Sequence, residues 1–76
     1  MKISRMKRAA LIWGRSEQLL RLFLQQDKLP FGSAVKGKGS HYIYHVEDHL
    51  LREYIGEEKW KEGLQRVEEY IKSVGD

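Results

Sequence analysis

The chain has no cysteine, a single proline and no long hydrophobic run among its 76 residues. The absence of cysteine excludes disulfide bonds and zinc sites built from thiolates. No stretch approaches the roughly 18 apolar residues of a membrane span, so we expect neither a transmembrane helix nor a secretory signal. The length corresponds to one small domain, too short to hold a nucleotide-hydrolysing sheet together with a substrate site. We therefore expect a soluble, cytoplasmic protein with no membrane partner.

Positive charge is concentrated in the first half of the chain, although the net charge is only +3. Residues 1–40 hold nine Lys and Arg against two acidic residues, whereas residues 41–76 hold five against nine. A basic half of this kind attracts polyanions, among which DNA and RNA are the first candidates. A solvated surface with uneven charge is the alternative, so the order of the predicted elements is needed to separate the two.

Two short helices separated by a tight turn are predicted near the N-terminus. Ser4 precedes the first helical pattern, and Gly14 permits a sharp turn after it, because glycine takes positive φ angles at little cost. Ser16 is a suitable N-cap for a second helix over residues 16–27. The apolar face of this second helix comprises Leu19, Leu20, Phe23 and Leu24.

The pattern changes from helical to alternating after Pro30. Residues 34–36 and 41–46 predict the two strands of a β-hairpin, and residues 37–40, which include two glycines, predict its turn. The tyrosines of the chain, like its other aromatic residues, are expected in the core. Contact of Tyr42 or Tyr44 with a DNA backbone is the alternative.

Two further helices are predicted after the hairpin. The third opens at residues 47–48 and ends at Gly56, with a buried face of Leu50, Leu51, Tyr54 and Ile55. The last runs over about residues 57–73, and its apolar residues recur at spacings of four and three, the pattern of a heptad seam. They are Trp60, Leu64, Val67, Ile71 and Val74. Gly63 weakens this helix by about 1 kcal/mol relative to Ala.

The order of helix, glycine-containing turn, helix and hairpin is that of a winged helix-turn-helix. We therefore expect a mostly α fold with a small β-hairpin, in which residues 1–56 form a winged helix-turn-helix DNA-binding domain. Residues 57–76 form a C-terminal amphipathic helix in this interpretation. That helix packs on the domain or forms an interface with a second chain.

The second helix and the hairpin carry side chains suited to double-stranded DNA. The major groove admits one α-helix, where Arg reads guanine and Gln reads adenine through paired hydrogen bonds. Phosphates are expected to meet the basic residues of the first helix and the lysines at the hairpin turn, whose glycines permit close approach. A solvated helix face and solubilising charges are the alternative. The predicted DNA-binding residues are Arg5, Lys7, Arg8, Arg15, Ser16, Gln18, Arg21, Gln25, Lys36 and Lys38.

Several short motifs follow one another along residues 3–55. They are Ala9-Ala10, Trp13-Gly14-Arg15-Ser16, Leu20-Arg21, Leu29-Pro30-Phe31-Gly32, and Tyr42 and Tyr44 followed by Leu50, Leu51 and Tyr54. Together they resemble the small winged-helix DNA-binding proteins of the phage excisionase and MerR type. The resemblance implies that residues 16–27 are the recognition helix and residues 32–44 the wing.

The resemblance also implies a biological role. Proteins of this type are architectural or regulatory factors, often of a phage or mobile element, so excision, repression and replication control all fit. The sequence departs from the family at Asp27-Lys28, where a glycine often ends the recognition helix, and the last helix lies outside the shared core.

Two patterns that suggest phosphate or metal chemistry have simpler explanations. Gly32, Gly37 and Lys38 approach the spacing of a P-loop, but no Ser or Thr follows the lysine to hold magnesium, and a strand pattern comes next. The three histidines recur every four residues from position 41, which on a strand separates them by about 13 Å, too far to share one metal ion. We expect no enzymatic activity, cofactor, metal or small-molecule substrate.

The last helix provides the competing class of function. Its apolar seam either folds back on its own domain, which a small core needs, or pairs with a second chain. In the second case the partner interface is Trp60, Leu64, Val67 and Ile71. The partner is then a second copy, a recombinase or a replication protein. A protein–protein adaptor with no DNA role is therefore the alternative to a sequence-specific DNA-binding protein.

Overall fold

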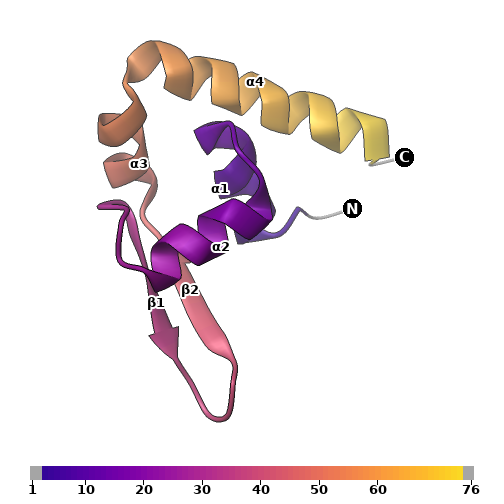
Figure 1. The fold of residues 1–76 in the computed structure, drawn as a ribbon. Helices are drawn as coiled ribbons and strands as arrows, with labels where there is room; N and C mark the ends of the chain where they lie inside the picture. The colour runs from indigo at the N-terminus through magenta and orange to yellow at the C-terminus, as the bar shows by residue number, and fades with distance from the viewer. Residues whose placement is uncertain (1–2, 75–76) are drawn as a thin grey trace.

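The computed structural model describes residues 3–74, which form four helices and a two-stranded antiparallel sheet (Figure 1). The elements are α1 (Arg5–Trp13), α2 (Glu17–Gln25), β1 (Gly32–Lys36), β2 (Tyr42–Val46), α3 (Asp48–Ile55) and α4 (Glu57–Val74). The predicted combination of a mostly helical fold with a small hairpin is confirmed. The predicted C-terminal segment also includes residues 75–76, and the predicted N-terminal domain includes residues 1–2, which lie outside the described residues.

Figure 1 shows the hairpin projecting from one end of the molecule and α4 lying across the other. Helix α1 lies beneath α4, and α2 crosses between α1 and the hairpin. No helix within residues 3–74 combines the length and the apolar character needed to cross a bilayer.

Local signals fix the starts of the first two helices, as the sequence predicts. The Ser4 hydroxyl accepts a hydrogen bond from the Lys7 amide at 3.1 Å, and the Ser16 hydroxyl accepts one from the Leu19 amide at 3.1 Å. Each bond satisfies a backbone donor that has no partner within the helix. Between the helices Gly14 takes a φ of 89°, which a side chain would strain.

Helix α2 ends at Gln25, two residues before its predicted end. Asp27 enters the left-handed region with a φ of 57°, a conformation that Asp adopts more readily than most residues. The chain then reverses, and the Lys28 amide donates to the Phe23 carbonyl at 3.0 Å. Asp27 thus supplies the backbone conformation for which a glycine is commonly used after a helix.

Helix α4 packs against α1 with their backbones in close approach at Gly63. A Cβ atom at this position would lie 2.6 Å from Cα of Ile12 and 2.8 Å from its carbonyl oxygen. Arg66 follows on the same helix and donates to the carbonyls of Leu11 at 2.7 Å and Ile12 at 3.2 Å. These carbonyls belong to the last turn of α1, where acceptors lack partners within the helix. The residue that the sequence identifies as a weakness of α4 is therefore its contact point with α1.

The core joins α1, α2, α3, α4 and the residues that lead into the hairpin. Its buried residues are Ala9, Ala10, Ile12, Leu20, Leu24, Leu29, Phe31, Leu51 and Val67. The ring centroid of Phe31 lies 6.2 Å from that of Trp13 and 5.4 Å from that of Tyr54. Phe31 therefore links the end of α1 to α3.

The prediction that the tyrosines are buried is wrong for Tyr42 and Tyr54. Tyr54 is 52% exposed, because its ring rests against Phe31 at the edge of the core and leaves one side in solvent. Tyr42 is exposed because it pairs with Lys36 at the far end of the hairpin, beyond the residues that pack on the core. Tyr44, nearer the base of the hairpin, does pack against the core.

Candidate nucleic-acid interface

The outward face of α2 gathers most of the predicted base-reading side chains. Gln18, Leu22 and Gln25 are exposed, and their spacings of four and three place them on one side of the helix. Ser16 and Arg21 line the same shallow hollow. The structure thus brings together four of the predicted residues, Ser16, Gln18, Arg21 and Gln25. We call this surface, with Leu22 at its centre, the α2 face.

Leu22 is a member of the α2 face that the sequence interpretation leaves out. Its side chain is 45% exposed, although the other leucines of α2 are buried or partly buried. The sequence does contain a signal for its position, because it stands four residues after Gln18 and three before Gln25. An apolar side chain therefore sits in the middle of an otherwise polar surface.

Two polar side chains of the α2 face are already engaged. Arg21 forms an ion pair with Glu17, one turn earlier on the same helix. The amide nitrogen of Gln25 donates to the Tyr44 hydroxyl at 2.5 Å, which connects α2 to β2. Gln18 differs from both, since no hydrogen bond ties its amide to another side chain within residues 3–74.

The hairpin extends the α2 face with a second surface. In the antiparallel register Ala34 pairs with Tyr44 and Lys36 with Tyr42, so these four side chains share one face of the sheet. That face is turned toward α2, because Tyr44 contacts Gln25. Lys36 therefore stands on the same side of the molecule as the α2 face. Lys38 lies in the turn beyond it, and both lysines are exposed.

Arg5 and Arg8, predicted as phosphate contacts, lie at another place. Arg8 donates two hydrogen bonds to the carboxylate of Asp48, at 2.9 and 3.0 Å. Arg5 lines the same crevice, beside Val46 at the end of β2. The cationic group of Arg8 thus ties α1 to the start of α3, and Arg5 remains exposed beside it.

Arg15 and Lys7 also lie apart from the α2 face. The Arg15 guanidinium stands 5.9 Å from the ring centroid of Trp13, in a crevice shared with α4. The Lys7 ammonium stands 5.0 Å from the ring centroid of Tyr70. Both contacts are of the cation–π kind, and both direct the charge toward α4. The ten predicted DNA-binding residues therefore fall into a central group of six on α2 and the hairpin and a scattered group of four.

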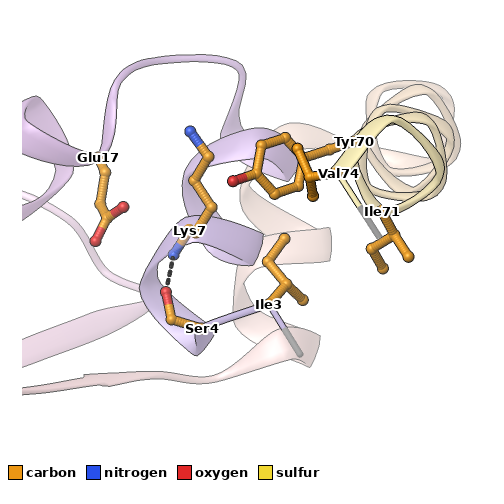
Figure 2. Close-up of a pocket in the computed structure, with 7 residues that line it drawn as sticks. All are labelled: Ile3, Ser4, Lys7, Glu17, Tyr70, Ile71 and Val74. Carbon is orange, nitrogen blue, oxygen red and sulfur yellow. Dashed lines mark hydrogen bonds between the residues drawn. The ribbon is translucent and has the colours of Figure 1, made fainter. Parts of the chain in front are cut away.

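The predicted partner interface on α4 divides into a covered and an uncovered part. Val67 is buried, and Trp60 and Leu64 pack against the core of the same chain. Ile71 and Val74, toward the end of α4, remain exposed. Figure 2 shows these two residues with Tyr70 and Ile3 around a crevice between α4 and the start of α1. Of the four predicted partner residues, Ile71 alone is open to another molecule.

The phosphate and metal patterns of the sequence form no site. Residues 32–36 are a strand, and the segment after Lys38 leads into a second strand rather than the helix of a P-loop. Within residues 3–74 no group of three or more His, Asp or Glu side chains is placed to hold a metal ion.

Comparison with known proteins found no matching family model, no matching curated protein and no matching solved structure. A proposal for the function therefore rests on the α2 face and the hairpin.

Proposed function

We propose that this protein is a winged helix-turn-helix that binds double-stranded DNA, with α2 in the major groove and the hairpin on the backbone or in the minor groove. The observation that carries the proposal is the joined surface of the α2 face and the lysine-bearing hairpin, connected by the bond between Gln25 and Tyr44. A major groove is wide enough for one helix, and amide and guanidinium groups match its base edges.

The distribution of charge supports a polyanionic partner on this side of the molecule. Residues 16–46, which include α2 and the hairpin, hold four basic against two acidic residues. Residues 47–74, which form α3 and α4, hold five basic against eight acidic residues. Since the hairpin and α4 lie at opposite ends (Figure 1), DNA would be attracted to the hairpin end.

The proposed role is that of an excisionase-like or regulatory factor of a phage or mobile element, without catalytic activity. Support comes from where the resembling motifs fall. Trp13-Gly14-Arg15-Ser16 forms the turn between α1 and α2, and Leu29-Pro30-Phe31-Gly32 leads from α2 into the hairpin. The first motif therefore positions α2 relative to α1, and the second joins the two elements that are proposed to contact DNA.

Titration of a labelled duplex of random sequence over a series of salt concentrations tests the proposal. We expect binding at micromolar protein in low salt, and a fall of log affinity with log salt at a slope of about −4 to −5 for about five neutralised phosphates. Selection from a random duplex pool then identifies the preferred site. Absence of binding, or an affinity that does not change with salt, would contradict the proposal.

An adaptor function is the second candidate, favoured by the uncovered apolar residues Ile71 and Val74 at the end of α4. In that case Ile71→Ser removes a protein–protein complex, and the duplex titration gives no shift. The same substitution leaves DNA binding unchanged if the α2 face carries the function. Measuring both properties on this one variant separates the two candidates.

A further inference from the structure

We propose that the α2 face selects thymine, through contact of Leu22 with the C5-methyl group, and so directs the protein to A·T pairs. The inference rests on the proposed DNA binding and adds the class of base that is read. It follows from which groups on the α2 face are open and which are engaged.

Leu22 occupies the centre of the surface that would enter the groove. An exposed leucine is ordinary on a protein surface, but this one lies between Gln18 and Gln25 and would be buried by a bound duplex. The edges of the bases in the major groove are polar except for the methyl group of thymine. An aliphatic side chain placed there gains free energy against thymine and leaves polar edges unsatisfied against the other bases.

Arg21 is less free than Gln18 and Leu22 to adapt to a base. Arginine reads guanine through paired hydrogen bonds from its guanidinium, and one nitrogen of the Arg21 guanidinium is already paired with the carboxylate of Glu17. The other N–H donors of Arg21 stay available, but the pairing holds the side chain against Glu17 and restricts the directions in which they can point.

The two glutamines differ in how free their amide groups are to contact a base. Reading adenine requires both the donor and the acceptor of an amide, and the Gln25 nitrogen already donates one of its two hydrogens to Tyr44, which fixes the orientation of the amide. Gln18 keeps both groups available within the described chain, so it is the side chain suited to adenine. Leu22 on thymine and Gln18 on adenine both belong to A·T pairs. The open groups of the α2 face therefore favour one kind of base pair.

The test uses the duplex most enriched by the wild-type protein from a random pool. That duplex is synthesised once with thymine and once with deoxyuracil, which lacks the methyl group and keeps every hydrogen-bonding group. We expect wild-type protein to bind the deoxyuracil duplex about fourfold more weakly for each methyl group contacted. We expect Leu22→Ala to bind both duplexes equally.

Val35→Ala is the matched control. Val35 is also an exposed aliphatic residue, but it lies on the face of the hairpin opposite Tyr44, so its variant should keep the wild-type preference for thymine. Far-UV circular dichroism checks that each variant is folded, and the wild-type comparison stands without any variant.

Two results would overturn thymine selection while leaving DNA binding intact. One is equal binding of the two duplexes by the wild-type protein, and the other is an unchanged preference in Leu22→Ala. Failure of the wild-type protein to bind any duplex would instead overturn the proposed function, and thymine selection with it.

Discussion

The α1–α4 side of the molecule and the α2–hairpin side are held together in different ways. Between α1 and α4 the backbones approach closely at Gly63, and Arg66 bonds directly to main-chain carbonyls. Between α2 and β2 a bond joins the exposed side chain of Gln25 to the partly buried side chain of Tyr44. The first arrangement tolerates little change, whereas the second leaves its side chains accessible.

The outer half of the hairpin shows most clearly that the two sides differ in the exposure of their side chains. Lys36 and Tyr42 pair across the two strands on the face turned toward α2, and both are exposed. At the contact of α4 with the end of α1, by contrast, Gly63 and Val67 are buried and Arg66 is partly buried. We infer that the α1–α4 side maintains the fold and the α2–hairpin side presents side chains to a ligand. Substitutions on the two sides should therefore affect different properties.

The largest loss of stability is expected for Gly63→Ala. The added Cβ would collide with the backbone of Ile12 and force α4 away from α1. We expect the free energy of unfolding to fall by about 3 kcal/mol, more than the roughly 1 kcal/mol that Ala gains over Gly within a helix. Urea denaturation followed by circular dichroism measures the change.

Gln65→Ala is the control for this substitution. Gln65 is exposed on the same helix, so its replacement should change stability by no more than about 0.5 kcal/mol. If Gly63→Ala were as stable as the wild-type protein, close approach of the two helices could not be what holds them.

A smaller loss is expected for Arg66→Met, which keeps an apolar stem and removes the bonds to Leu11 and Ile12. We expect stability to fall by about 1.5 kcal/mol, since charge-assisted bonds to partly buried carbonyls are lost. Arg52→Met removes an exposed ion pair with Glu57 and should cost less than about 1 kcal/mol. Equal losses of stability in the two variants would show that the carbonyl bonds of Arg66 contribute no more than an exposed ion pair.

The smallest effect on stability, and a clear effect on binding, is expected for Lys36→Gln combined with Lys38→Gln. Both lysines are exposed, so stability should stay within about 0.5 kcal/mol of the wild-type value. The salt slope of DNA binding should become less steep by about 1.8 if each lysine neutralises one phosphate.

Lys59→Gln combined with Lys61→Gln changes the net charge equally on the exposed surface of α4. This control should retain the wild-type salt slope. If the salt slope became less steep by the same amount in both double variants, net charge rather than the hairpin would account for the attraction of DNA.

The parts of the fold that the sequence predicts correctly depend on neighbours close in the chain. Ser4 and Ser16 cap their own helices, Gly14 and Gly56 end the helices just before them, and alternation marks the second strand. Each of these signals lies within a few residues of the structure that it sets. For this reason the elements could be placed without knowledge of how they pack.

The features that the sequence misses depend on partners far away in the chain. The need for glycine at position 63 comes from the nearby backbone of Ile12. The exposure of Tyr54 comes from its position against Phe31. On the α2 face, glutamine and arginine could be identified by residue type, but the engagement of Gln25 depends on where β2 lies. Periodicity reveals which side of a helix is polar. It does not reveal which of those polar side chains are bonded to a neighbouring element.

The pairing of Arg21 with Glu17 has a kinetic consequence for the proposed complex. A face whose cation is neutralised in place exerts little long-range attraction, so Lys36, Lys38 and their neighbours would accelerate encounter with DNA. The uncharged groups of α2 act only at contact distance and would mainly lengthen the lifetime of a correct complex. The rate of association and the lifetime of the complex would thus be controlled by separate parts of a very small protein.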